Sequence, residues 1–183
     1  PLEVRGQNDC YRVHSGWSGV NFGSGFSVHF MELISELFCS LYPKSVIHVN
    51  QISIDGGGQF GSHSSHHNGQ DVDISYLGAQ PFQNWVEDGV IKKDFPYEIN
   101  WEFIKLASQQ KAAPINYFFV NKAIKKGFCQ WAQKTGRTTS EDLEVLRKIY
   151  PWGGHTKHMH LRLKCSTGYR GCHNYDDLSA PDC

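Results

Sequence analysis

The sequence has 183 residues, of which 18 are Lys or Arg and 18 are Asp or Glu, so its formal net charge is zero. This length suffices for a hydrophobic core, and we expect residues 1–183 to form a single domain. The balanced charge excludes a general attraction to nucleic acid or an anionic membrane, and the apolar runs are far shorter than the roughly 20 residues of a bilayer span.

Helical and strand patterns alternate along the chain. Apolar residues at helical spacing predict a helix over residues 27–41, which Pro43 ends. Strands are predicted over residues 44–55 and 72–77, with a glycine loop at 56–58 between them. The later elements are a helix over 100–110, a strand over 115–121, a helix over 121–136, a helix over 140–150 capped by Ser140, and a strand over 157–165. This order predicts an α+β fold with a small, mainly antiparallel sheet flanked by helices.

The cysteines form an even set without a CxxC pair, which favours disulfides over a zinc or redox motif. We interpret them as three disulfides, although six buried free thiols are the alternative. Disulfides imply an oxidising compartment, so we expect a periplasmic or secreted protein. The spacing leaves all pairings open among Cys10, Cys39, Cys129, Cys165, Cys172 and Cys183.

The stretch "GSHSSHHNGQDVDIS", residues 61–75, places histidines close to a carboxylate. His63 and His66 are three residues apart, and Asp73 follows at the start of a predicted strand. Such a segment alone is more typical of a polar loop without a metal. A catalytic zinc, however, requires three ligands drawn from His, Asp, Glu or Cys together with one open position.

A second group of histidines lies far along the chain. His158 and His160 alternate in a predicted strand and therefore share one of its faces, and His155 stands just before them in a Gly-Gly-His turn. Together the two groups predict a metal site. Imidazole nitrogen with one carboxylate suits Zn²⁺, while a redox iron site would use the same ligand types.

Two charged residues near these histidines have two interpretations each. Asp71 either holds a ligand histidine in its tautomer or caps the loop. Arg162 either meets a substrate carboxylate or forms a structural ion pair, and we favour the ion pair.

The two segments "GSHSSHHNGQDVDI" and "YPWGGHTKHMHLRLKC" resemble the penicillin-insensitive murein endopeptidases. That family shows G-H-x-S-H-x-x-G-x-D-V-D-I, followed by P-W-x-x-H-x-x-H-M-H-x-R-L-x-C. It belongs to the wider group of D-alanyl-D-alanine dipeptidases, lysostaphin-type enzymes and hedgehog domains. The resemblance runs from about residue 49 to residue 172, whereas residues 1–45 are less recognisable.

The resemblance implies one zinc ion per chain, bound by His66, Asp73 and His160. His158 corresponds to the family's catalytic histidine. His63 and His155 correspond to further catalytic-site histidines. Whether His158 acts as a general base or as an electrostatic stabiliser stays open at this point.

The implied activity is zinc-dependent hydrolysis of the peptide cross-links of peptidoglycan, with D-alanyl to meso-diaminopimelate bonds as the expected target. Two alternatives are a D,D-carboxypeptidase or dipeptidase on the same scaffold and a non-catalytic zinc or cell-wall binding module. The expected partners are cross-linked stem peptides.

The resemblance also implies the pairing of the cysteines. Cys165 with Cys172 and Cys129 with Cys183 match cysteines of the family, which leaves Cys10 with Cys39.

Overall fold

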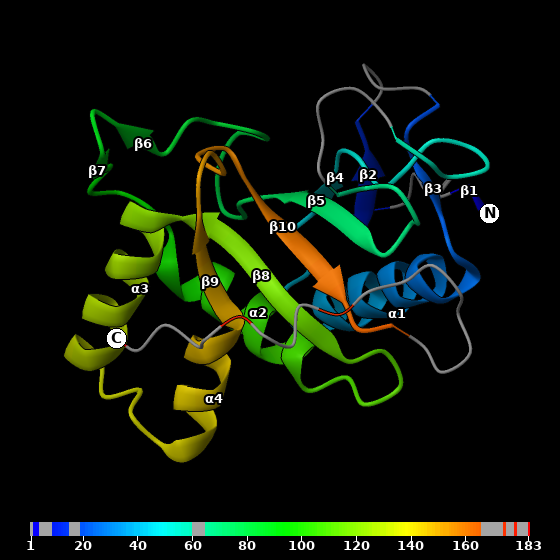
Figure 1. Cartoon of the computed structure of the whole chain (residues 1–183). Helices are drawn as coiled ribbons and strands as arrows, with labels where there is room; N and C mark the ends of the chain where they lie inside the picture. Colours follow the sequence, from blue (N-terminus) through cyan, green and yellow to red (C-terminus); the bar gives the residue numbers. More distant parts are fainter. Residues whose placement is uncertain are drawn as a thin grey trace.

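The structure is a computed structural model that describes residues 2–3, 9–14, 19–59, 65–165, 174, 178 and 183. Its principal element is a six-stranded sheet with the strand order β2-β4-β5-β10-β8-β9, and Figure 1 shows the helices below this sheet and beside its left end. The α+β class predicted from the sequence is therefore confirmed. Among the described helices, none is both long and apolar enough to cross a membrane.

The sheet is antiparallel in its centre and parallel at both edges. β4 (Ile47–Val49), β5 (Asp71–Ser75), β10 (His158–Leu163) and β8 (Ile115–Asn121) pair with their neighbours in antiparallel fashion. The edge strands β2 (Tyr11–Val13) and β9 (Ile149–Trp152) pair in parallel with β4 and β8. Among these strands, three of the five pairings are thus antiparallel, as the sequence predicts.

The two faces of the sheet differ in chemistry because side chains alternate along each strand. On β5, Val72 and Ile74 belong to the hydrophobic core, while Asp71 and Asp73 point to the opposite face. β10 continues this pattern with core residues at alternate positions, so its histidines lie on the same face as the aspartates. The fold therefore has an apolar face under the helices and a polar face that carries the histidines and aspartates.

The helices close the apolar face of the sheet. They are α1 (Gly25–Leu41), α2 (Tyr97–Ser108), α3 (Lys122–Lys134) and α4 (Ser140–Lys148). Helix α1 begins at the N-cap Ser24, whose hydroxyl accepts from the backbone N–H of Ser27. Four of the apolar residues at the predicted helical spacing are buried, namely Val28, Met31, Ile34 and Phe38, whereas Leu41 at the end of the helix is 62% exposed.

The structure differs from two predictions about helix α4, one at its start and one at its end. Helix α4 is capped by Thr139 and not by Ser140, because Thr139 forms a capping box with Asp142, in which each side chain bonds the backbone of the other residue. Ile149 and Tyr150 do not continue this helix but begin β9, where pairing with β8 satisfies their backbone groups.

Other boundaries also differ from the predictions. The predicted strand over residues 44–55 is reduced to β4 and an isolated bridge between Ser53 and Asn21, although Asn50 and Gln51 still exchange backbone hydrogen bonds with Asp73 of β5. The structure adds short pairs that the sequence pattern did not indicate: β1 (Leu2–Glu3) with β3 (Phe22–Gly23), and β6 (Val86–Glu87) with β7 (Val90–Ile91).

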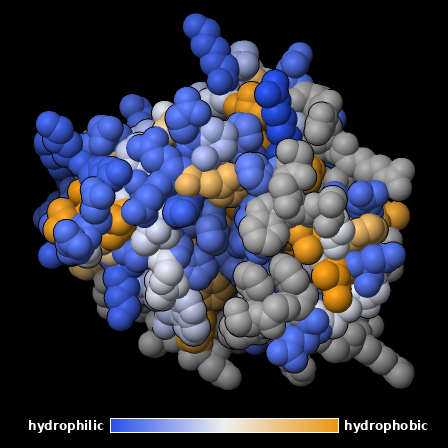
Figure 2. Space-filling model, turned by 90° about the horizontal axis from the view of Figure 1, so that it is seen from above, coloured by the Kyte–Doolittle hydropathy of each residue, from blue (hydrophilic) through white to orange (hydrophobic). Residues whose placement is uncertain are grey.

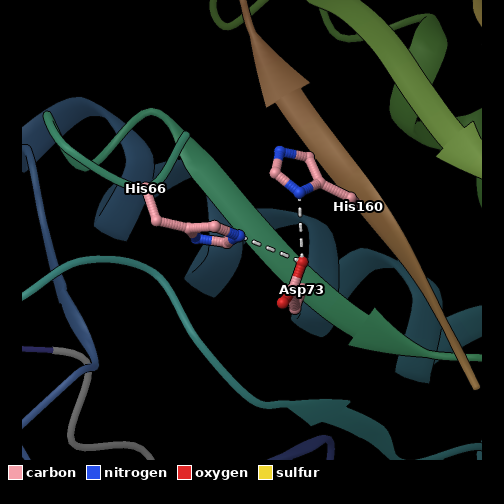
Figure 3. A group of neighbouring side chains, drawn as sticks. All are labelled: His66, Asp73 and His160. Atoms are coloured by element: carbon pink, nitrogen blue, oxygen red, sulfur yellow. Dashed lines mark ion pairs between the residues drawn. The ribbon is translucent and has the colours of Figure 1, made fainter. Parts of the chain in front are cut away.

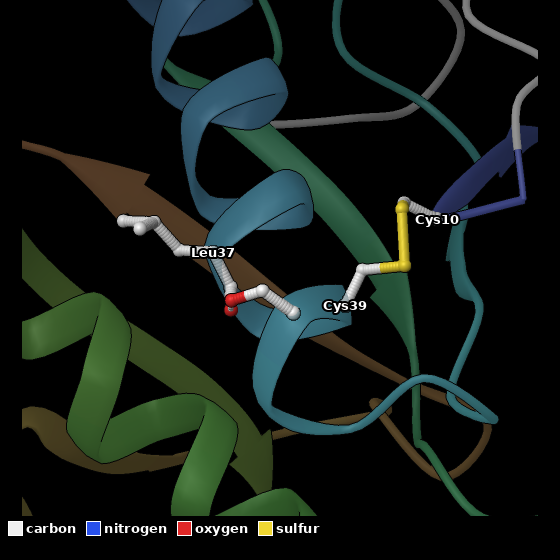
Figure 4. The surroundings of a disulfide bond; sticks show 4 residues. Cys10, Leu37 and Cys39 are labelled. Atoms are coloured by element: carbon white, nitrogen blue, oxygen red, sulfur yellow. Dashed lines mark hydrogen bonds between the residues drawn. A yellow bond between two sulfur atoms is a disulfide. The ribbon is translucent and has the colours of Figure 1, made fainter.

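The structure describes two disulfides rather than three. Cys10–Cys39 ties the segment before β2 to the last turns of α1, as Figure 4 shows, and Cys129–Cys183 ties α3 to the C-terminal residue. Both pairings agree with the prediction. The third predicted pair, Cys165–Cys172, lies outside the described residues because Cys172 does, and it stays a prediction.

The surface offers few large apolar side chains. Figure 2 shows a largely hydrophilic upper face, on which the apolar side chains outside the grey region form small, separate groups. Among the described residues, the exposed large hydrophobic side chains are Leu2, Leu37, Leu41, Val90, Leu143 and Trp152.

Candidate metal centre

Three side chains from distant parts of the sequence converge on the polar face of the sheet. The Oδ1 atom of Asp73 lies 3.3 Å from Nε2 of His66 and 3.3 Å from Nδ1 of His160 (Figure 3). One ligand atom from each of the three residues falls within 4.8 Å of the other two. All three residues are buried, so they form a compact group that could hold one metal ion.

The strand register places two members of this group. His160 on β10 pairs directly with Asp73 on β5, and both side chains point away from the core. His66 comes from the loop before β5 and has a φ of 65°, a left-handed conformation that a non-glycine residue rarely adopts. Such strain persists only where the surroundings hold it in place. Here it turns the imidazole toward the sheet.

A backbone carbonyl fixes the imidazole of His66. Its Nδ1 atom lies 2.8 Å from the carbonyl oxygen of Ile52, which can only accept, so Nδ1 carries the proton. The lone pair of Nε2 therefore faces Asp73. A ring nitrogen that donates to a backbone carbonyl, as Nδ1 of His66 does here, is typical of metal-binding histidines.

A second carboxylate fixes the imidazole of His160. The Nε2 atom of His160 lies 2.8 Å from Oδ1 of Asp71, and Oδ2 of Asp71 accepts from the backbone N–H of His66 at 3.1 Å and from Arg162. Asp71 thus acts in both ways that the sequence left open, because it orients a histidine and holds the loop. Arg162 forms the structural ion pair favoured from the sequence.

The pKa values follow from this crowding of charge. Burial alone would raise the pKa of Asp71, but the hydrogen bond and charge of His160 and the charge of Arg162 outweigh it and lower the value to about 2. Burial likewise opposes ionisation of Asp73, yet His66 and His160 hold the pKa of Asp73 well below its usual range. Burial would lower the pKa of His160, but Asp71 and Asp73 raise it to about 9. The carboxylates therefore stay ionised, and their charge favours a cation at this centre, either the imidazolium form of His160 or a metal ion that replaces its Nδ1 proton.

The donor set fits a metal ion. Oδ1 of Asp73 is buried without a hydrogen-bond donor, and the lone pair of His66 points toward it. Burying an unsatisfied carboxylate oxygen against a second acceptor is costly unless a cation lies between them. Two imidazole nitrogens and one carboxylate oxygen are the ligand types that zinc binds at catalytic sites, which keep a fourth position open.

Two further histidines border the three-residue group. The Nε2 atom of His158 lies 3.6 Å from Oδ1 of Asp73, and the His158 side chain is 27% exposed. The His155 ring lies 5.3 Å from that of His158 and 5.8 Å from that of His160, measured between ring centroids. Burial and the neighbouring histidines lower the pKa of His155 to about 4, so its imidazole is neutral near pH 7.

The turn that carries His155 is held from several sides. Its Nδ1 lies 2.7 Å from the carbonyl oxygen of Gly153, and its own carbonyl accepts a hydrogen bond from Tyr76 at 2.9 Å. The side chain of Asn121 donates to the carbonyl of Gly154. His155 has a φ of 53°, so the turn presents its imidazole in a conformation that these contacts maintain.

Five of the six site residues predicted from the sequence lie together in the structure: His66, Asp73, His160, His158 and His155. The sixth, His63, lies outside the described residues. The carbonyl of Ile52 was missed, because a backbone contact leaves no signal in the residue type. The pairing of Asp71 with His160 could have been expected from the alternation on β5, since Asp71 and Asp73 share one face.

These features define the class of the protein: an α+β domain whose sheet carries a buried group of two histidines and one aspartate suited to a divalent metal. The family model of the penicillin-insensitive murein endopeptidases, Peptidase_M74, matches residues 7–183, and the chain belongs to this family.

Curated relatives named penicillin-insensitive murein endopeptidase agree with this assignment. Those of Escherichia coli strain K12, Escherichia coli O139:H28 and Shigella boydii serotype 18 are each 30% identical to this chain over 181 residues. The match covers 91% of this chain and 62% of each relative. The chain thus spans somewhat less than two thirds of the length of these proteins.

Proposed function

We propose that this protein is a zinc-dependent endopeptidase that hydrolyses peptide cross-links of bacterial peptidoglycan, D-alanyl to meso-diaminopimelate bonds in particular. The observation that carries the proposal is the position of the His66 and His160 imidazoles beside Oδ1 of Asp73, a buried atom that accepts no hydrogen bond. Family membership supports the choice of peptidoglycan as substrate.

In this proposal His66, Asp73 and His160 hold one zinc ion. Zinc bound there would supply a water of lowered pKa and would polarise the carbonyl of the scissile bond. The chain's own residues orient the imidazoles for the ion: the carbonyl of Ile52 holds Nδ1 of His66 and the carboxylate of Asp71 holds Nε2 of His160, so the other nitrogen of each ring faces Asp73.

His158 is the residue we propose for proton transfer. It is partly exposed and lies beside Asp73, so its Nε2 can accept a proton near the centre and return it to the departing amine. Histidine suits this task because its ordinary pKa lies close to neutral pH. The neutral His155 would contact the substrate beside it, and His63 is proposed as a further histidine of the site on the family resemblance.

Location outside the cytoplasm is consistent with this function. The described cysteines contain no free thiol, and disulfides persist in oxidising compartments. Peptidoglycan also lies outside the cytoplasmic membrane. We therefore propose a periplasmic or secreted protein.

The test is digestion of defined cross-linked muropeptide dimers, with products identified by mass spectrometry. Zinc-loaded protein is expected to release monomers, and a chelator is expected to stop the release until zinc is restored. Asp73→Asn and His160→Ala should abolish both cleavage and stoichiometric zinc binding. His29→Ala, the control, removes an exposed histidine on α1 and should change neither cleavage nor zinc binding.

The same experiment separates the alternatives. Loss of a terminal D-alanine without separation of the dimer would indicate a carboxypeptidase or dipeptidase. Zinc binding and peptidoglycan binding without any cleavage would indicate a binding module. His158→Ala should retain zinc but lose turnover, and retained turnover in that variant would contradict its proposed role.

A further inference from the structure

The polar face of the sheet continues from the metal centre into a row of aromatic side chains. In the strand register His160 pairs with Phe119 on β8, and Phe119 pairs with Tyr150 on β9. The ring centroids lie 5.5 Å apart for His160 and Phe119 and 5.9 Å apart for Phe119 and Tyr150. These rings therefore form a continuous row from the centre to the edge of the sheet, in which His160 and Phe119 are buried.

Trp152 forms the exposed end of this row. Its ring lies 5.5 Å from Phe119 and 6.3 Å from Tyr150, yet the residue is 46% exposed, whereas Phe119 is only 6% exposed. Tyr117 adds a fourth ring, 5.4 Å from Tyr150. We call these four residues, Tyr117, Phe119, Tyr150 and Trp152, the aromatic platform.

The distance between platform and centre limits what could bind there. Neighbouring strands lie about 4.8 Å apart, so two strand spacings from β10 to β9 amount to about 10 Å. An extended peptide covers that distance in about three residues. A group on the platform would thus belong to the same substrate molecule as a peptide bond at the centre, but would not be the bond that is cut.

We propose that the aromatic platform binds a sugar ring of the glycan strand to which the stem peptide is attached. This inference rests on the proposed function. A pyranose ring has polar groups along its rim and C–H groups on its faces, and those C–H groups are attracted to the negative face of an aromatic ring. Tyr150 and Trp152 each combine an aromatic body with a polar tip that could hydrogen-bond the rim of the sugar.

A peptide added as a further strand fits this position less well. β9 lies at the edge of the six-stranded sheet, where an extended peptide could pair with it. Pro151, the third of the four residues of β9, has no backbone N–H to donate. The strand edge is thus interrupted beside Trp152, while its aromatic ring remains accessible.

A positioning role for Trp152 must be separated from sugar binding, because Trp152 directly precedes the turn that carries His155. We therefore use ligands that contain no cross-link: a disaccharide-bearing stem-peptide monomer and the same peptide without sugar. Isothermal titration calorimetry with the full, zinc-loaded chain gives the dissociation constant of each. The ligands differ only in the group that the platform is proposed to bind.

The wild type is expected to bind the disaccharide-bearing peptide more tightly than the free peptide. Trp152→Ala should weaken binding of the former by roughly fivefold, the loss expected for one aromatic contact, and leave the latter within about twofold. Trp152→Phe, which keeps a ring, should retain most of the affinity. Leu41→Ala, which removes a 62% exposed apolar side chain on α1, should change neither constant.

Equal affinity of the wild type for the two ligands would overturn the inference. So would a Trp152→Ala variant that weakens both ligands alike, because the platform would then contact the peptide or support the turn. Cleavage of cross-linked dimers, measured in parallel, reports on the proposed activity alone. Because the monomers contain no cross-link, the binding result stands whether or not the dimers are cut.

Discussion

Replacement of Asp71 by asparagine tests the account of the metal centre most directly. The Asp71 carboxylate is fully buried and accepts from His160, from the backbone N–H of His66 and from Arg162. Asparagine has nearly the same shape, but it has no charge and places an NH₂ donor where an acceptor is required. Arg162, which is 5% exposed, would lose its ion pair with this carboxylate, and His160 would lose the group that orients its ring.

The expected magnitude follows from two independent arguments. Breaking a buried ion pair by removing one partner costs about 3–5 kcal/mol. The pKa of Asp71, lowered from 3.8 to about 2, corresponds to about 2–3 kcal/mol. Because the pKa is lower in the folded state, this stabilisation is complete above about pH 4 and is lost as the pH falls toward 2. At pH 7, Asp71→Asn should therefore lower the free energy of unfolding by about 2–5 kcal/mol.

Urea unfolding in the presence of a chelator measures this loss without any contribution from bound metal. Competition with a chromophoric zinc chelator measures the metal affinity, which should fall about 10- to 100-fold when the orienting partner of a ligand histidine is removed. Asp94→Asn, at an exposed position, serves as the control and should change neither quantity. If Asp71→Asn stayed within 1 kcal/mol and twofold of the wild type, as expected for a substitution at a surface site, Asp71 would not organise the centre.

Three predictions concern the scaffold. Thr139→Ala removes the capping box of α4 and should cost about 1 kcal/mol in urea unfolding, whereas Ser140→Ala should be close to neutral; equal effects would contradict the placement of the cap. Replacing Cys10 and Cys39 together by serine should cost about 3–4 kcal/mol, since the bond closes a loop between residues 29 positions apart; an unchanged denaturation midpoint would be inconsistent with that crosslink. Gly127→Ala would place a methyl group 2.0 Å from the hydroxyl oxygen of Tyr97 in α2. This overpacking should cost about 1–3 kcal/mol of stability and lower the melting temperature. A variant as stable as the wild type would argue against the close contact of α2 with α3.

The spacing of apolar residues predicted helices and strands correctly where the residues of a segment alone decide its conformation. The strand over residues 115–121 agrees with the prediction at both ends, and α1 and α3 lie within two residues of theirs. The predicted end of the helix over residues 140–150 was wrong because Ile149 and Tyr150 continue the helical spacing of apolar residues, although both residue types are common in strands. Their pairing with Phe118 and Phe119 of β8, 31 positions earlier in the chain, decides for the strand.

The residue types show which chemistry is available to this protein: two groups of histidines, a carboxylate at a strand start, and motifs long enough to identify the family. How those groups meet depends on the fold. The antiparallel register of β5 and β10 brings Asp73 beside His160. The carbonyl of Ile52 turns His66 toward them, and Asp71 holds both histidines. Residue types are local properties of the chain, whereas the direction of a lone pair depends on hydrogen bonds between segments that only folding brings together.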